Sequence, residues 1–334
     1  MSVESDIQSA KDLVTKFYSC LDNAHVDTLA DVMLEHTAPD YLWRGYHPFH
    51  ELSLPEEVAS IFWQPLRHSL KHLQRRQDVF MSGRNEMDDF SSTWVISMGH
   101  LMGLFDEPWL GIKPTGKMAM LRYCEFNKVE NGKISETAMF FDIPHLMVQA
   151  GLQPFPPQTG AQLVQPGPVC HTGLMFNAQQ PAEGEKTLNA INYMINTLGN
   201  WDQKLSLEQE LRLSWHENMI WWGPTGIGSS YTIERYIQQH SGPFRSSFKN
   251  RDFNGHICRM AEGEFGGFFG WPNLTLEPTG GFMGMPATGK SGEMRVIDIY
   301  RRDGDKLAEN WVFIDLLHFW NQQGVDILSR MEKL

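Results

Sequence analysis

The most informative part of this sequence is residues 284–324, which read GMPATGKSGEMRVIDIYRRDGDKLAENWVFIDLLHFWNQQG. An earlier segment, residues 111–151, reads GIKPTGKMAMLRYCEFNKVENGKISETAMFFDIPHLMVQAG and aligns with it without a gap. The offset is 173 residues and 12 of the 41 aligned positions are identical, whereas unrelated segments of average composition would share about two or three. Because this period is much longer than the repeats of solenoid proteins, it predicts a duplicated domain.

The limits of the two copies can be predicted from composition. Five prolines lie between Pro154 and Pro168, in a segment without helical or strand periodicity. Proline removes backbone donors and favours extended conformations, so residues 154–180 are predicted to form a stiff linker. The first domain is then residues 1–153 and the second is residues 181–334.

Within each copy, helical patterns come first and strand patterns follow. Apolar residues at helical spacing predict a helix over residues 13–21. Asp27 is predicted to cap a second helix, and Ser53 is predicted to begin a third. The dipeptides at 131–132 and 303–304 predict tight turns between strands. Helices followed by antiparallel strands predict an α+β fold in each copy.

Composition excludes several classes of protein. The 334 residues contain 28 basic and 40 acidic side chains, a net charge of −12, which disfavours binding to nucleic acid. The sequence contains no run of 18 apolar residues, so no membrane span is predicted, and the N-terminus lacks the pattern of a secretory signal. The four cysteines are far apart and match no zinc spacing. We therefore expect a cytoplasmic protein with reduced thiols.

Residues 284–291 match the phosphate-binding pattern G-x-x-x-x-G-K-[ST]. That mechanism needs a helix directly after the lysine, so that its N-terminal N–H groups hold phosphate. Residues 293–302 instead alternate as a strand does. We therefore predict a glycine turn leading into a strand, and no nucleotide cofactor.

Two histidine pairs are weak candidates for metal binding. His68 and His72 have the i, i+4 spacing that suits zinc on a helix, but arginines and lysines surround them. His47 and His50 lie in a predicted loop without a visible third ligand. We predict no metal site.

Two aspartates end apolar strands, where an unpaired carboxylate is costly. They are Asp142 and Asp315. Hairpin registers counted back from the turns place Asp142 on one face with Glu125, and Asp315 on one face with Asp298. Two acids at different depths of one cavity would fit this arrangement. The alternative is that each terminal aspartate caps the helix that follows; for Asp315 both interpretations stay open, and for Asp142 capping is favoured.

Residues 262–285 are rich in glycine and aromatic side chains, including Trp271. They could form the wall of a pocket for a flat ligand, or a bent sheet whose glycines relieve crowding. The two interpretations are compatible, because a curved sheet can create the pocket.

The order of these motifs carries a family resemblance. The second copy has G-x-x-x-T-G-K, an alternating strand, a D-G turn, K-L-A-E-N-W, Asp315 and Q-Q-G, and the first copy repeats most of it. This order resembles the SnoaL-like polyketide cyclase family, over about forty residues in each copy. The resemblance implies two cone-shaped domains like nuclear transport factor 2, each a curved antiparallel sheet packed on N-terminal helices around a deep apolar cavity.

The resemblance also implies a chemistry. Characterised family members close a ring by intramolecular aldol condensation without a metal or redox cofactor, and an aspartate deep in the cavity acts as acid and base. That role would fall on Asp315, and on Asp142 by repeat. Ala138 stands where the family has tryptophan, and Glu125 stands where the second copy has Asp298. Family cyclases have a single domain, whereas this chain is a tandem.

Different classes of function remain open. One is a cofactor-independent polyketide (ester) cyclase or isomerase/lyase, in which a carboxylate of raised pKa acts on a small apolar or aromatic carbonyl compound. Another is a non-catalytic protein that binds small molecules in the same cavity, and a third is an oligomerising module with filled cavities. The candidate catalytic residues are Asp315, Asp142, Asp298, His318 and His145; the candidate substrate-binding residues are Trp311, His100, Glu125, Trp271, Trp221 and Trp43. The two copies are expected to pack as an intramolecular pseudo-dimer, and a homo-oligomer is also conceivable.

Overall fold

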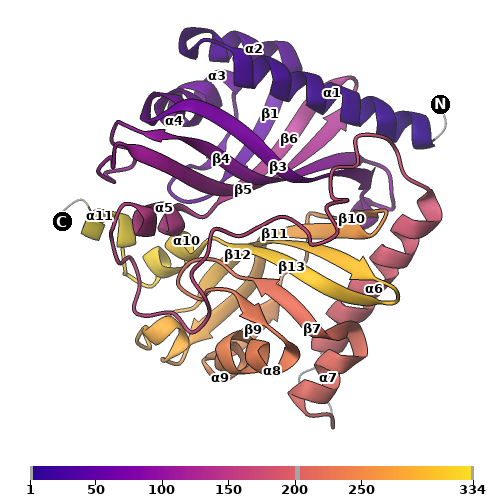
Figure 1. Cartoon of the computed structure of the whole chain (residues 1–334), viewed down its shortest axis with the longest axis vertical. Helices are drawn as coiled ribbons and strands as arrows, with labels where there is room; N and C mark the ends of the chain where they lie inside the picture. Colours follow the sequence, from indigo (N-terminus) through magenta and orange to yellow (C-terminus); the bar gives the residue numbers. More distant parts are fainter. Residues whose placement is uncertain (1–2, 200–203, 332–334) are drawn as a thin grey trace. The chain divides into compact units, whose positions relative to one another are not determined.

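The computed structural model of the chain describes residues 3–199 and 204–331. The chain folds into two compact units. Unit 1 comprises Met1–Pro154, Val169–Ala178 and Val325–Leu334, and unit 2 comprises Phe155–Pro168 and Gln179–Gly324. Both contain a sheet and helices (Figure 1).

Unit 1 is built on a six-stranded sheet with the strand order β2-β1-β6-β5-β4-β3. Neighbouring strands are antiparallel, except that β1 and β6 are parallel. The elements of unit 1 are α1 (Val3–Asn23), η1 (Val26–Thr28), α2 (Leu29–His36), β1 (Thr37–Gly45), β2 (His50–Leu52), α3 (Pro55–Val58), the π-helical turn η2 (Ala59–Trp63), α4 (Gln64–Ser69), β3 (Leu70–Arg84), η3 (Glu86–Asp88), β4 (Thr93–Phe105), β5 (Lys117–Glu130), β6 (Lys133–Phe141), α5 (Ile143–Gln149) and α11 (Ile327–Met331).

The N-terminal helices of unit 1 lie on one face of its sheet (Figure 1). Helix α1 buries Val14, Phe17, Tyr18 and Leu21, which recur at the spacing of one helical face. This face packs on β3 and β4. Burial of that apolar stripe holds the helix on the sheet.

Unit 2 repeats this plan with seven strands in its sheet. The strand order is β10-β11-β12-β13-β7-β8, and β9 pairs with β11. Again one pair, β13 and β7, is parallel. The elements of unit 2 are α6 (Pro181–Gly199), α7 (Leu207–Ser214), β7 (Trp215–Trp222), β8 (Ser230–Tyr231), α8 (Ile233–Tyr236), the π-helical turn η4 (Ile237–Ser241), α9 (Gly242–Ser246), β9 (Phe248–Phe253), β10 (Cys258–Glu262), β11 (Phe265–Pro278), η5 (Phe282–Gly284), β12 (Gly292–Asp303), β13 (Lys306–Ile314) and α10 (Leu316–Gln322).

The predicted α+β class, with helices before a largely antiparallel sheet, is confirmed in both units. Two predicted helix starts are wrong. Asp27 lies inside the turn η1, and the residue that precedes α2 is Thr28. The residue that precedes α3 is Leu54; Ser53 instead donates its backbone N–H to the Glu57 carboxylate at 3.3 Å. Neither Thr28 nor Leu54 caps its helix through its side chain, so neither start carries a capping side chain that the sequence could show.

The predicted linker, residues 154–180, is divided between the units. In unit 1 the Lys11 ammonium donates to the Met175 carbonyl at 2.6 Å, and Leu174 forms a parallel bridge with Phe80. In unit 2 residues 155–168 contribute the carbonyl of Pro166, which accepts from a tryptophan of β13 at 3.2 Å. The proline-rich segment is therefore packed along much of its length.

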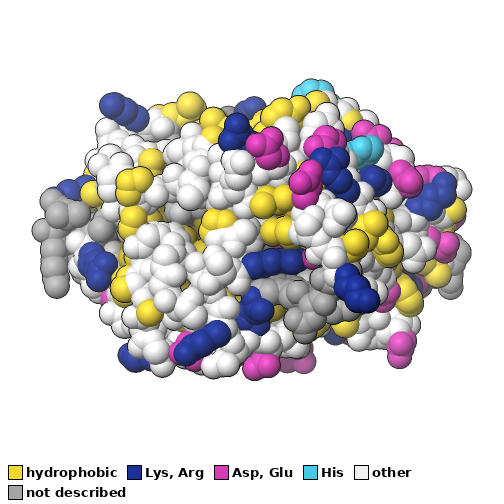
Figure 2. All heavy atoms as spheres, turned by 90° about the horizontal axis from the view of Figure 1, so that it is seen from below, with side chains coloured by type: hydrophobic (Ala, Val, Ile, Leu, Met, Phe, Trp, Pro, Cys, Tyr) yellow, Lys and Arg dark blue, Asp and Glu magenta, His cyan; other side chains and the backbone are white. Residues whose placement is uncertain are grey.

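The helices of the described residues are all too short or too polar to cross a membrane. Acidic and basic side chains are interspersed on the face shown in Figure 2, without a continuous basic area there.

Candidate functional site

A β-bulge in strand β6 sets the position of the acids in unit 1. Ser135 is an extra residue opposite the pair 128–129 of β5, so Glu125 lies opposite Met139 rather than one residue earlier. The backbone N–H of Asp142 donates to the carbonyl of Arg122 at 3.1 Å. Because side chains alternate between faces, Glu125 and Asp142 lie on opposite faces. The predicted common face is wrong.

The same bulge recurs in unit 2. Ala308 is the extra residue of β13, and beyond it Asp298 pairs with Val312. The backbone N–H of Asp315 donates to the carbonyl of Arg295 at 3.0 Å. Asp298 and Asp315 therefore also lie on opposite faces, and the prediction that they share one is wrong for the same reason.

Asp142 and Asp315 cap the helices that follow them. The Asp142 carboxylate accepts from the backbone N–H of His145 at 3.0 Å, and the Asp315 carboxylate accepts from that of His318 at 3.1 Å. Asp315 is fully buried, and its second oxygen lies 3.7 Å from the Arg295 guanidinium. The capping interpretation accounts for these contacts, and an acid–base role for the two aspartates stays a prediction.

Asp298 is the acid that faces the interior of unit 2. It is 9% exposed, and its carboxylate accepts from the Asn310 side-chain amide at 3.1 Å and from the Tyr300 phenol. Burial raises the pKa of Asp298 to about 7, although both hydrogen bonds lower it. No described basic side chain forms an ion pair with this carboxylate. Asp298 is thus a buried acid that can be protonated or ionised near neutral pH.

A cavity of about 680 Å³ is lined by Phe268 and Tyr300, two neighbours of Asp298, whereas Asp298 itself is not a lining residue. Tyr300 both lines the cavity and hydrogen-bonds Asp298, so it links the two. The lining residues are Met194, Ile195, Asn196, Leu198, Gly199, Phe244, Arg251, Asp252, Phe253, His256, Phe268, Asn273, Leu274, Leu276 and Tyr300. The mixture of aromatic and aliphatic walls with a few polar groups is typical of small-molecule sites.

Two histidines of unit 2 are neutral and stacked on aromatic rings. His256 lies on Phe268 with ring centroids 3.9 Å apart, and His240 lies on Trp221 at 4.0 Å. Burial lowers the pKa of each imidazole to about 3. The His256 ring lines the cavity, and its buried Nδ1 has no hydrogen-bond partner among the described residues. The His256 ring is therefore a neutral, polar part of the cavity wall.

Unit 1 holds a different group at the equivalent position. Glu125 is 2% exposed, and its carboxylate lies 3.1 Å from the Arg75 guanidinium. Burial raises the pKa of Glu125, and the charge of Arg75 and a hydrogen bond from Tyr18 oppose this effect. The hollow beside Arg75, of about 500 Å³, is lined mostly by polar and charged residues. Glu125 of unit 1 is therefore paired with a basic side chain, whereas Asp298 of unit 2 has no ion-pair partner among the described residues.

The predicted tryptophans of unit 2 are not gathered in one place. Trp221 lies next to Asn310 across the parallel strand pair, on the face that carries Asp298. Trp311 lies on the opposite face and donates its indole N–H to the linker, as described above. Trp271 stacks under the guanidinium of Arg295 at 3.7 Å. Neither Trp311 nor Trp271 is among the residues that line the cavity.

The predicted binding residues Trp43 and His100 and the predicted catalytic residue His145 of unit 1 have structural neighbours. Trp43 is buried against Phe62, with ring centroids 5.1 Å apart. His100 lies 3.6 Å from the carboxylate of Asp78. Burial lowers the pKa of His145, so its imidazole is neutral at pH 7. None of these contacts distinguishes a binding role from core packing.

Several site residues were missed from the sequence. Tyr300 could have been found, because strand alternation places it on the same face as Asp298, two residues away. Asn310 could not, because it reaches that face only through the bulge at Ala308. His256 and Tyr236 come from distant segments with no local motif, and burial, followed by the charge of Asp298, raises the pKa of the Tyr236 phenol. Only tertiary packing brings them to the acid.

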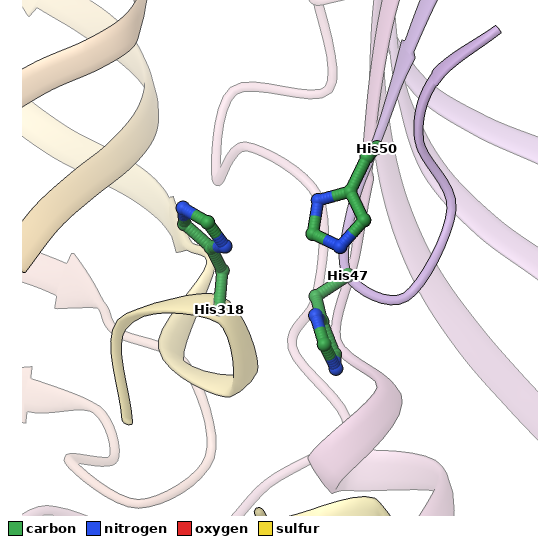
Figure 3. Close-up of side chains that lie close together, drawn as sticks. All are labelled: His47, His50 and His318. Carbon is green, nitrogen blue, oxygen red and sulfur yellow. The ribbon is translucent and has the colours of Figure 1, made fainter. Parts of the chain in front are cut away.

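The nucleotide and metal patterns have structural explanations. Strand β12 follows the glycine loop directly, as predicted, so no helix N-terminus is available there for phosphate. His68 belongs to α4 but His72 to β3, so the expected i, i+4 pair on one helix does not form. Figure 3 shows His47 and His50, which follow β1 in unit 1 with ring centroids 5.1 Å apart, and His318 on α10 of unit 2.

Comparison with protein families supports the resemblance. The model of the SnoaL-like polyketide cyclase family matches residues 273–323. This segment includes Asp298, Tyr300 and Asn310. The predicted resemblance to that family is confirmed for this part of the chain. The comparison with curated proteins returned no match.

Several solved structures resemble part of the chain. A candidate SnoaL-like polyketide cyclase from Jannaschia sp. CCS1 is 19% identical, with 47% of this chain and 97% of that chain covered and a TM-score of 0.36. A nuclear transport factor 2-like protein from Burkholderia thailandensis E264 is 19% identical, with 43% and 98% covered and a TM-score of 0.33. TsrD from Streptomyces laurentii is 17% identical, with 41% and 96% covered and a TM-score of 0.32.

Proposed function

We propose that unit 2 carries out acid–base chemistry on a flat, apolar carbonyl compound, with Asp298 as the proton acceptor and donor. The observation that carries this proposal is the environment of Asp298: a buried carboxyl of raised pKa, without an ion-pair partner among the described residues, beside an aromatic cavity. A group that titrates near the working pH can both take and return a proton. The SnoaL-like match over residues 273–323 supports the cyclase or isomerase class.

In this proposal the ionised Asp298 removes a proton from the carbon next to a carbonyl group. The Tyr300 phenol and the Asn310 amide hold the carboxylate in place through the hydrogen bonds described above. The neutral imidazole of His256, on the cavity wall, would hydrogen-bond the substrate oxygen as charge develops there. The proton then returns from Asp298 to complete an intramolecular ring closure or an isomerisation. This scheme needs no redox cofactor.

A base-sensitive probe can test the acid without knowledge of the substrate. 5-Nitrobenzisoxazole is flat and aromatic. When a base removes the proton on C3 of its isoxazole ring, the N–O bond breaks and the product is a coloured cyano-nitrophenolate. We expect the wild-type rate to rise with pH and to level off above a midpoint near 7, the pKa of Asp298. Asp298→Asn should lower the rate by about a hundredfold or more, since the amide cannot accept the proton.

The matched control is Asp305→Asn. Asp305 is an exposed acid of unit 2 that is not among the residues lining the cavity, so its loss should leave the probe rate within about twofold. Unchanged turnover in Asp298→Asn would remove Asp298 from the mechanism. If calorimetry shows that the probe binds while no product forms at any pH, the non-catalytic binding protein becomes the better description.

The ligand class, the cellular location and the oligomeric state of the chain are also proposals. A small apolar or aromatic carbonyl ligand follows from the cavity walls and from the resemblance. A cytoplasmic location, an intramolecular pseudo-dimer and a homo-oligomer rest on sequence alone. Size-exclusion chromatography with light scattering would test the oligomeric state directly.

A further inference from the structure

Arg75 directs a charged side chain into the interior of unit 1. It belongs to β3, and its side chain is 3% exposed. A guanidinium in such a position is costly unless carboxylates and hydrogen-bond acceptors surround it. The surroundings of Arg75 therefore show what kind of group this interior is built to hold.

Two carboxylates meet the guanidinium. One Nη lies 3.1 Å from Glu125, and the Nε and the other Nη lie 3.1 and 3.5 Å from the two oxygens of Asp22. The paired contact with Asp22 uses the planar fork of the arginine, which an ammonium could not match. The Glu125 side chain is only 3% exposed, so its charge is compensated from within unit 1.

Three aromatic rings complete the enclosure. The guanidinium carbon lies 4.0 Å from the ring centre of Tyr18, 5.2 Å from that of Tyr123 and 5.6 Å from that of Trp63. Aromatic faces attract cations at such distances, most strongly where water is excluded. Carboxylates and aromatic faces together form a receptor for a planar cation.

The receptor is held in place by other contacts. The Tyr18 phenol accepts from the Asn127 amide at 2.9 Å, and the Asn127 carbonyl oxygen accepts from Thr137 at 2.8 Å. The Tyr123 phenol shares a hydrogen bond of 2.8 Å with Ser97. These contacts help to orient the rings of Tyr18 and Tyr123 in addition to the contacts that both make with Arg75.

Unit 2 differs at the corresponding edge of its sheet. The long strand β3 of unit 1 is replaced there by two shorter strands, β9 and β10. The residues between them include His256, whose neutral ring lines the cavity. The guanidinium of Arg75 thus occupies the space between Glu125 and the aromatic rings of unit 1, beside the polar hollow of about 500 Å³. The equivalent region of unit 2 holds the aromatic cavity of about 680 Å³.

We propose that unit 1 contains a recognition site for a planar cation of the guanidinium class, which the chain fills with its own Arg75. The enclosure around Glu125 then takes no separate cation. This proposal rests on the geometry of unit 1 and does not depend on the proposed chemistry of Asp298.

Chemical rescue tests the site. Arg75→Ala should lower the melting temperature of unit 1, and 10 mM methylguanidinium should restore part of it. For a Kd near 1 mM the expected rise is roughly 3–6 °C. Urea at the same concentration has nearly the same planar shape but no charge, so it should give no rise. Wild-type protein should not respond to methylguanidinium, because its site is occupied.

The control is Arg84→Ala on the same strand. Arg84 pairs with Asp6, but its side chain is 24% exposed, so methylguanidinium should not raise the melting temperature of this variant. If Arg75→Ala does not fold, Arg75→Met with Glu125→Gln removes both charges of the pair and should fold without responding to methylguanidinium. An Arg75→Ala protein that urea stabilises equally, or that neither compound stabilises, would overturn the proposal; so would a double variant that still responds.

Discussion

Replacing Asp298 with asparagine should change how the stability of unit 2 depends on pH. Burial raises the pKa of Asp298 in the folded protein from its ordinary 3.8 to about 7. Below pH 3.8 the carboxyl is protonated in both folded and unfolded chains. Between the two values the unfolded chain has lost the proton and the folded chain has kept it, so stability falls as pH rises.

The magnitude follows from the pKa difference. Moving from 3.8 to about 7 at about 1.4 kcal/mol per pKa unit corresponds to a loss of about 4 kcal/mol, most of it between about pH 4 and pH 7. Above about pH 7 no further loss comes from this group. The asparagine variant has no charge to bury, so it lacks this term. The melting temperature of the variant minus that of the wild type should therefore be roughly 10 °C larger at pH 8 than at pH 4.5.

The assay is thermal unfolding of wild type and Asp298→Asn at pH 4.5, 6, 7 and 8, followed by tryptophan fluorescence and calorimetry. The variant also changes the hydrogen bonds with Tyr300 and Asn310, but that contribution should be nearly constant across this range. For Asp252→Asn, at an exposed position of the cavity, the difference in melting temperature from wild type should be the same at all four pH values. If the difference in melting temperature between Asp298→Asn and wild type does not vary with pH, the pKa of Asp298 is not raised by burial in the folded protein.

Three further predictions follow from other contacts. Tyr300→Phe removes a hydrogen bond that lowers the pKa of Asp298, so the midpoint of the probe reaction should move upward by about one pH unit, as a pH–rate profile would show; an unchanged midpoint would mean that the phenol does not contact the acid in solution. His256→Phe keeps the stacked ring on Phe268 but removes the imidazole nitrogens. The KM for 5-nitrobenzisoxazole should therefore rise, while the melting temperature stays within about 3 °C of wild type. Equal KM values in the variant and the wild type would argue against contact between His256 and the probe. Asp315→Ala deletes a helix cap and should cost about 0.5–2 kcal/mol in urea unfolding, whereas Asp315→Asn should cost less, because the amide oxygen can still accept from the His318 N–H; equal losses would contradict the capping role.

The fold class was accessible from sequence because its signals are local. The apolar stripe of α1 and the tight turn at 131–132 each depend on neighbouring residues. The bulges at Ser135 and Ala308 were not accessible, since an extra residue in a strand leaves the alternation on either side intact. This single omission placed the two acids of each predicted pair on one face, whereas they lie on opposite faces. The choice of Asp315 as the catalytic acid came from the family resemblance.

The sequence by itself predicted the α+β plan, revealed the internal sequence repeat and contained the segment that resembles SnoaL-like cyclases, because periodicity and repetition are properties of the chain order. Tertiary structure alone decided how the acids are used. Glu125 and Asp298 stand at equivalent positions of the repeat, yet one is paired with Arg75 and the other lies beside a cavity without an ion-pair partner among the described residues. The strand that carries Arg75 is far from Glu125 in sequence, and the energy of a buried carboxyl depends on the groups that folding places within a few ångströms of it.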